Sequence, residues 1–206
     1  MGAALLRKPT MPKSKDREIS LALQGGGAHG AFTWGVLDRL IEEPGLSIKA
    51  ITATSAGATN AVAFAAGLAQ GGEDGAKAAL ERYWRTISQK GAPFSAFSWA
   101  NSPFTGLPFG PFQAAMAFTS IASPYEFNPF DINPLRDALD EAVDFDAVHA
   151  APVDLFLSAT NVETGRVKVF QDGEISRDAV LASACLPQTF RAVEINGSAY
   201  WDGGYM

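Results

Sequence analysis

The chain has 206 residues, of which 47% are hydrophobic and 18% charged, and its net charge at pH 7 is −6. This length suits one globular domain with a buried core, and the acidic balance argues against a nucleic-acid partner, which selects a basic face. The single cysteine, Cys185, excludes an internal disulfide framework, and with only two histidines we expect neither a metal site nor a cofactor.

Residues 1–16 are basic, and their apolar stretch AALL is shorter than the hydrophobic region of a secretory signal peptide. We expect them to form a disordered lead-in to one domain over 17–206. No stretch reaches the apolar length of a membrane span. The expected location is the cytoplasm, with peripheral contact to a membrane or lipid surface.

Apolar patterning predicts the first elements in chain order. Residues 18–24 and 48–54 are expected to be strands, with a helix over 28–43 between them. Two helices, 56–72 and 74–89, follow the second strand. This order of strands and helices indicates parallel strands in a helix-flanked sheet.

Residues 91–130 interrupt the pattern. The segment carries one charge, Glu126, is rich in proline and aromatic residues, and keeps neither a strand nor a helix period. Disordered segments are poor in aromatics, so we expect an ordered apolar insertion that acts as a cap. Core packing or an oligomer interface is the alternative interpretation.

Helices and strands alternate again after this insertion. The predicted elements are helices at 132–143 and 176–185, strands at 153–160 and 165–171 that can form a hairpin, and two short strands within 192–204 about a turn at Asn196-Gly197.

The stretch GGGAHG, which begins at Gly25, places bare N–H groups where the first strand passes into a helix. Its spacing satisfies the dinucleotide fingerprint, but the second strand ends in AITATS, without the carboxylate that holds a ribose hydroxyl. N–H groups at a helix N-terminus can also stabilise a developing oxyanion. An anion cradle, a dinucleotide site and a tightly packed turn are therefore the three interpretations.

The stretch ATSAG lies between the second strand and the next helix. Its strand–Ser–helix pattern is typical of the nucleophile elbow G-x-S-x-G, with Ala53 in place of the first glycine. The helix that follows is rich in small residues and can leave room for the methyl group. The simpler interpretation of Ser55 is a helix N-cap.

The late stretch WDGGY holds Asp202, which can belong to an ordinary turn. A serine nucleophile needs a base, and no histidine follows Asp202 as the Ser–Asp–His chain order requires. His29 lies in the glycine loop, and His149 is expected in a surface turn. Asp202 itself is therefore the candidate base.

Taken together, the GGGAHG loop, TSAG and the late DGG resemble the patatin-like phospholipases, and residues 182–205 are similar to the stretch that leads to the catalytic Asp of that family. The resemblance spans roughly residues 18–205 without the insertion. It implies a three-layer α/β/α fold with a central, mostly parallel sheet. It also implies a metal-independent lipid acyl hydrolase with a Ser–Asp dyad.

The resemblance assigns the site by position. Ser55 matches the nucleophile and Asp202 the dyad acid, and the oxyanion hole matches three glycines, Gly25, Gly26 and Gly27. Ala53 stands where the elbow of the family usually has glycine. His29 stands where the loop commonly carries Arg or Lys, and a neutral histidine supplies no fixed positive charge.

The predicted function is a serine hydrolase of phospholipid or other long-chain acyl esters, in transient contact with a membrane or lipid surface. The alternatives are a lipid-binding or scaffold protein that kept the fold and lost turnover, and a dinucleotide enzyme. Met206 follows the DGG motif closely, which would leave one sheet face uncovered. We therefore expect a further C-terminal segment or, failing that, cover by the insertion or by a second copy in a homo-oligomer.

Overall fold

The computed structural model describes residues 17–99 and 123–206. The expected lead-in, 1–16, and the middle of the expected cap, 100–122, lie outside the described residues. The chain forms a six-stranded mixed sheet in the order β1-β2-β3-β6-β5, with β4 paired to β3. The strands are β1 (Arg17–Leu23), β2 (Leu46–Ala53), β3 (Asp154–Asn161), β4 (Val167–Gln171), β5 (Val193–Ile195) and β6 (Ser198–Asp202).

Strands β1, β2 and β3 are parallel, and the other three pair antiparallel. The β3–β4 and β5–β6 pairs are antiparallel because a short connection joins the two strands of each pair, and tight turns join only antiparallel neighbours. In the second of these, Asn196 and Gly197 have φ of 51° and 78°. Positive φ at both positions is the requirement of a two-residue hairpin turn, so the predicted turn is confirmed.

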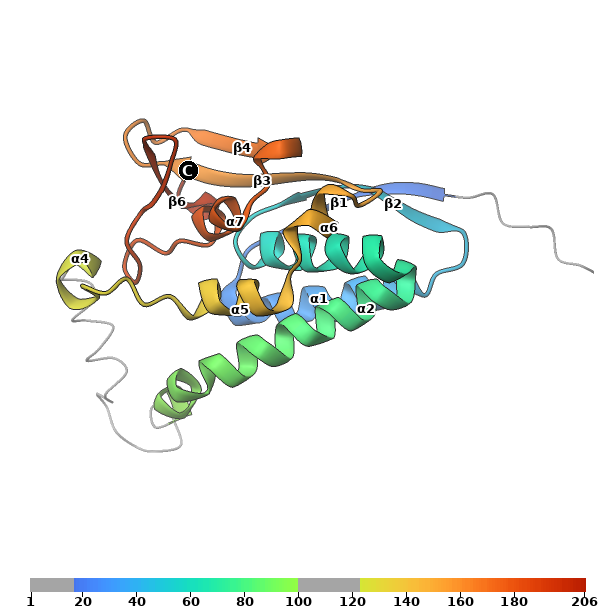
Figure 1. The fold of residues 1–206 in the computed structure, drawn as a ribbon, viewed down its shortest axis with the longest axis horizontal. Coiled ribbons are helices and arrows are strands. Elements are labelled where there is room, and N and C mark those ends of the chain that lie inside the picture. Colours follow the sequence, from blue (N-terminus) through green and yellow to red (C-terminus); the bar gives the residue numbers. More distant parts are fainter. Residues whose placement is uncertain (1–16, 100–122) are drawn as a thin grey trace, which may run out of the picture.

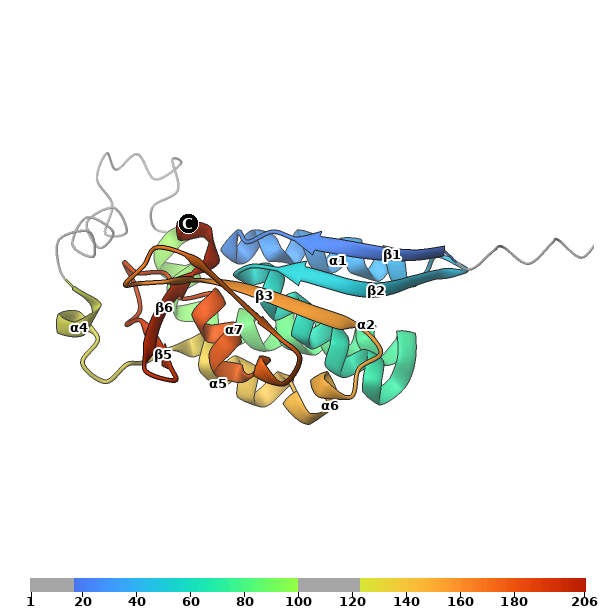
Figure 2. The ribbon, with the colours of Figure 1, turned by 90° about the horizontal axis from the view of Figure 1, so that it is seen from above.

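The helices of the described residues are α1 (Gly30–Ile41), α2 (Ala56–Trp99), α4 (Pro124–Phe127), α5 (Pro134–Ala142), α6 (Phe145–His149) and α7 (Arg177–Ser183), with short 3-10 turns η1 (Gly27–His29), η3 (Asp172–Glu174) and η4 (Gly203–Tyr205). All of these helices except α4, which stands apart at the left of both views, lie on one side of the sheet (Figures 1 and 2). The α/β fold is confirmed, whereas these residues place no helix on the other sheet face. Among the described helices, none is long and apolar enough to cross a membrane.

Helix α2 is the centre of the core. Its residues 56–67 are all buried because alanines and glycines let this part of the helix approach the sheet closely. Gly71 and Gly72 break the helical geometry at the predicted boundary, and the chain folds back so that a Cβ on Gly67 would lie 2.3 Å from Gly75 O. Only glycine allows this contact.

Two helical segments differ from the prediction. The backbone of α2 stays helical to Trp99, past the expected end at residue 89. Helix α6 was expected as a surface turn, and His149 lies exposed in its last turn. Asp144 starts α6 by accepting hydrogen bonds from Asp146 N and Ala147 N. Five residues are too few for a periodic pattern to reveal such a helix.

Candidate active site

The strand pairings bring the ends of β2 and β6 together beside β3. Leu157 of β3 pairs with Ala53, the last residue of β2. Ala159, two residues further along, pairs with Asp202, the last residue of β6. Both β3 residues also pair with β4, so β4 occupies one edge of β3 while β2 and β6 approach each other along the other edge. Ser55 follows β2 by two residues, and it lines the same cavity as Asp202.

Ser158 of β3 lies between these two strand ends and contacts the residue that follows each of them. Its hydroxyl forms a hydrogen bond with the hydroxyl of Thr54. A Cβ on Gly203 would lie 2.5 Å from Ser158 O, a distance that no side chain tolerates. The first glycine of the DGG motif therefore lets the residue after β6 reach the end of β2.

The turn that carries Ser55 has the strand–turn–helix form expected of ATSAG. Ser55 has φ of 55°, a left-handed conformation that costs a non-glycine residue about 1 kcal/mol or more. An N-cap residue is typically extended, so this geometry is not that of an ordinary N-cap. The N–H of Ser55 donates to the carbonyl oxygen and Oγ of Ser183, at 3.1 and 3.0 Å. A Cβ on Gly57 would lie 2.3 Å from Leu23 O, so the helix needs glycine there.

The glycine loop passes directly beside this turn. A Cβ on Gly25 would lie 2.8 Å from Ser55 Cβ, and Gly26 and Gly27 have φ of 146° and 55°. Within residues 17–99 and 123–206, no backbone carbonyl of a turn, loop or helix cap accepts a hydrogen bond from the N–H groups of Gly25, Gly26 or Gly27. The backbone N–H of His29 donates a hydrogen bond to Gly26 O, with the two heavy atoms 3.1 Å apart. The loop thus presents free donors beside Ser55.

Asp202 is 4% exposed and has one carboxylate oxygen in use. Its Oδ1 accepts a hydrogen bond of 2.8 Å from Gly204 N, so Asp202 does cap the turn η4. Its Oδ2 is buried and has no hydrogen-bond partner among the described residues. Its backbone is fixed through Cys185 O, at 2.8 Å, and Thr160 Oγ1, at 3.0 Å. An unpartnered buried carboxylate oxygen is costly, and such groups mark functional sites.

The cavity that joins these groups has a volume of about 1020 Å³. Its wall is mostly apolar and comes from α1, α2, α5 and the segment after α7; the larger apolar side chains are Trp34, Tyr83, Trp84, Ile87, Leu135 and Leu186. Asp202 is the one charged residue among its described lining residues. Burial raises the pKa of Tyr83 to about 12, so its phenol stays neutral. Such a chamber suits an uncharged, largely apolar ligand.

Asn60 is a residue of this site that sequence reasoning missed. It is fully buried, and its Nδ2 donates to Gly30 O at 3.1 Å and to Ala56 O at 2.9 Å. Its Oδ1 accepts from Trp84 Nε1 at 2.9 Å. Asn60 thus joins the exit of the glycine loop, the residue after Ser55 and the cavity wall. The available signal was an amide side chain within an alanine-rich helix, where a polar group needs a partner.

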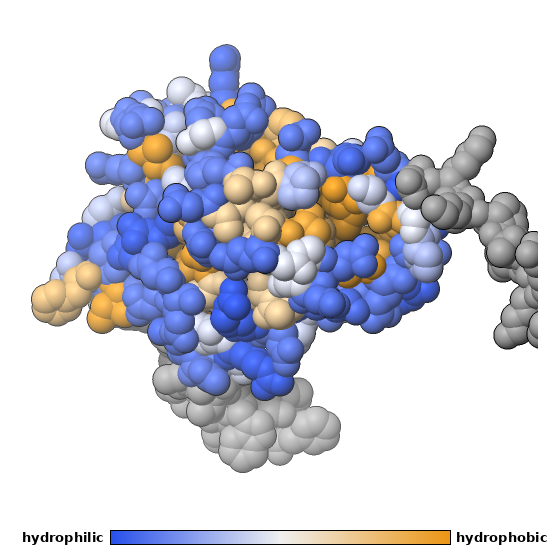
Figure 3. Space-filling model, turned by 45° about the vertical axis from the view of Figure 1, so that its right-hand side comes forward, coloured by the Kyte–Doolittle hydropathy of each residue, from blue (hydrophilic) through white to orange (hydrophobic). Residues whose placement is uncertain are grey.

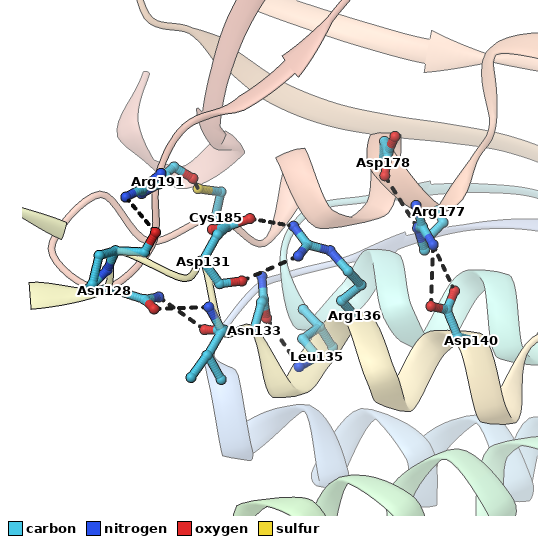
Figure 4. Close-up of polar contacts among 12 residues, drawn as sticks. Asn128, Asp131, Asn133, Leu135, Arg136, Asp140, Arg177, Asp178, Cys185 and Arg191 are labelled. Carbon is cyan, nitrogen blue, oxygen red and sulfur yellow. Dashed lines mark hydrogen bonds and ion pairs between the residues drawn. The ribbon is translucent and has the colours of Figure 1, made fainter. Parts of the chain in front are cut away.

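Ion pairs fix α5, which contributes to the cavity wall, and join it to α7 (Figure 4). Arg177 of α7 reaches both carboxylate oxygens of Asp140 of α5, each at 3.2 Å. Arg136 of α5 donates to Asp131 Oδ2 at 2.8 Å. Asn133 caps α5 by accepting from the N–H of Leu135, the α5 residue that lines the cavity. The position of Leu135 is therefore set by α5 and its neighbours.

Comparison with known proteins gives one family. The family described as patatin-like phospholipase matches residues 21–206. No curated protein matches the chain. Among solved structures, VipD from Legionella pneumophila is similar, with 17% sequence identity and a TM-score of 0.47. The match covers 94% of this chain and 46% of VipD, so the chain spans about half the length of that protein.

Proposed function

This chain belongs to the patatin-like phospholipase family, and on that premise we propose that it hydrolyses long-chain lipid acyl esters, such as phospholipids, with Ser55 as nucleophile and Asp202 as general base. The observation that carries the proposal is the shared cavity. Ser55, the free N–H groups of the glycine loop and the unpartnered Oδ2 of Asp202 surround one apolar chamber.

The proposed reaction has two steps. Ser55 Oγ attacks the ester carbonyl carbon while Asp202 takes the hydroxyl proton, and the proton then passes to the departing alcohol. The N–H groups of Gly25, Gly26 and Gly27 hold the oxyanion, where each donor is worth about 3 kcal/mol of barrier. Water then gives a proton to Asp202 and attacks the acyl-enzyme; the bond to Ser55 Oγ breaks, Oγ takes the proton back from Asp202, and the fatty acid leaves.

The cavity supports a long acyl chain as the substrate group. Its wall is lined by Trp34, Trp84, Ile87 and Leu135 and carries no described charge apart from Asp202. A neutral alkyl chain loses its contact with water there without leaving a polar group unpaired. The residues of 91–130 that lie outside the described structure stay a proposed apolar cap over the acyl chain.

The second function, a lipid-binding or scaffold protein without turnover, needs the same cavity but no nucleophile. The left-handed φ of Ser55 favours hydrolysis over this alternative, because backbone strain persists where function requires it.

A series of p-nitrophenyl esters from acetate to palmitate tests the proposal. The purified protein should hydrolyse them, with kcat/KM rising with chain length as the chain fills the cavity. Ser55→Ala should remove this activity and leave the melting temperature within a few degrees. A Ser88→Ala variant, which removes a different serine hydroxyl from the cavity lining, is the matched control and should keep it. Absence of hydrolysis at every length, with the palmitate ester still bound, would support the scaffold instead.

A further inference from the structure

A short projection, residues 124–132, consists of α4 and the segment that leads to α5, and it exposes three large apolar side chains. Phe130 is 85% exposed, Ile132 66% and Tyr125 56%. Figure 3 shows a hydrophobic projection at the left edge of an otherwise largely hydrophilic margin, on the side where Figure 1 places α4. Three large apolar side chains on one short segment form an exposed apolar patch, and such patches mark interaction sites.

The backbone beneath these side chains is tightly held (Figure 4). Asn128 Nδ2 donates to Ile132 O at 3.0 Å, and Ile132 N donates to Asn128 Oδ1 at 2.8 Å. Asp131 has φ of 50°, and Arg136 pairs with its carboxylate. A left-handed residue closed by a two-way amide bond fixes the turn, so the apolar side chains are presented by a built structure and not by a loose loop.

Arg191 ties this projection to the segment beside the cavity. Its Nη2 donates to Pro129 O at 3.1 Å and to Tyr125 O at 3.4 Å, and its guanidinium lies 5.2 Å from the centre of the Tyr125 ring. Arg191 belongs to the chain segment that begins with Leu186, which lines the cavity and is 42% exposed. The projection is therefore held by the same chain segment that supplies Leu186 to the cavity wall.

We propose that this projection is a lipid-docking site, in which Phe130 and Ile132 insert into an uncharged lipid surface and bring the cavity to its substrate. The proposal rests on the proposed function for the identity of the partner. Even if each of the three side chains buried about 250 Å², the top of the range for an aromatic residue, the total would stay at about 750 Å², and their partial exposure lowers it further. A stable protein partner needs about 800 Å² on each side, so lipid insertion fits this small projection better.

The charges favour a neutral surface over an anionic one. The projection and the two arginines bonded to it carry no net charge. Glu126 and Asp131 are acidic, and Arg136 and Arg191 are basic. The whole chain carries −6, which repels anionic headgroups. Docking should therefore depend on apolar insertion and not on salt.

Sedimentation with phosphatidylcholine vesicles tests the docking site, with Ser55→Ala protein so that the vesicles are not consumed. The protein should bind, and binding should change less than twofold between about 50 and 500 mM NaCl. The double variant Phe130→Ser/Ile132→Ser should lower the partition coefficient at least tenfold. A matched control, Val167→Ser/Val169→Ser, removes two other exposed apolar side chains, 50% and 41% exposed, and should stay within twofold.

Equal binding by the Phe130/Ile132 variant, or an equal loss in the control, overturns the proposal, provided that the melting temperatures agree. Gel filtration tests the other occupant of this face, a second copy of the chain. Self-association that the Phe130/Ile132 variant abolishes would show that this face is an interface between copies, and it would overturn the proposal. Binding is measured without turnover. Failure of ester hydrolysis therefore refutes the proposed function separately from the docking site.

Discussion

Replacing Asn60 by alanine should destabilise the fold by removing three buried hydrogen bonds and orphaning one buried donor. The variant leaves Trp84 Nε1 without its partner, whereas Ala56 O keeps the bond of 2.9 Å from Thr59 Oγ1 and Gly30 O, in the first turn of α1, keeps its helical N–H donor. An orphaned buried donor costs about 1–3 kcal/mol and each of the two lost amide bonds adds about 0.5–1.5 kcal/mol, so the expected loss is about 3 kcal/mol. For a chain of this size each kcal/mol lowers Tm by about 2–4 °C, which gives a fall of about 6–12 °C.

Thermal unfolding by circular dichroism measures this fall, and ester hydrolysis per titrated active site measures its effect on the glycine loop. Trp84→Phe orphans Asn60 Oδ1 and also removes buried ring volume, so it should destabilise the fold by a similar amount. Thr86→Val, another buried position on α2, lies outside the network and should change kcat less than twofold. Asn60→Ala should lower kcat at least tenfold. A Tm within about 2 °C of the parent, or a kcat within twofold of it, would contradict this role of Asn60.

The other predictions concern the base, the pH range and the insertion. Asp202→Asn should lower kcat at least about a hundredfold at nearly constant Tm, because the amide keeps the shape but cannot take a proton; His29→Ala should keep most activity, and the reverse pattern would make His29 the base. Burial raises the pKa of Cys185 from 9.0 to about 12 and that of Tyr83 from 10.0 to about 12. The folded state thus holds both protons more tightly, so their stabilising contribution is complete below about pH 9 and is lost toward pH 12. The urea midpoint should fall over that range, less so in Cys185→Ala, and an unchanged slope would contradict this origin. A charge inserted into 91–130 should reduce hydrolysis of long-chain esters more than of short ones, whereas equal losses would indicate general damage.

Local patterns in the sequence were enough for the parts of the fold that depend on neighbours in the chain. Strands β1 and β2, which lead to the glycine loop and to Ser55, and the turn at Asn196-Gly197 were predictable because apolar alternation and glycine at positive φ act within a few residues. The glycines also gave a usable signal. Gly57 stands where helix α2 approaches Leu23 O, a contact that forbids a Cβ.

The remainder depends on contacts between distant segments. Sequence patterns gave no sign that β2 and β6 share one edge of β3, because register is set by tertiary pairing. Ser183, which holds the Ser55 amide from 128 residues away, and the partners of Asn60 were hidden for the same reason. The helical backbone that continues to Trp99 runs through Pro93, against the local preference.

Covalent trapping of the nucleophile is the sharpest test of the proposed pair of Ser55 and Asp202. A fluorophosphonate carrying a long alkyl chain is incubated with the purified protein, and the modified peptide is identified by mass spectrometry. We expect one adduct, on Ser55, whose rate of formation falls at least tenfold in Asp202→Asn and which is absent in Ser55→Ala. An adduct on any other residue, or ester turnover that persists in Ser55→Ala, would contradict it.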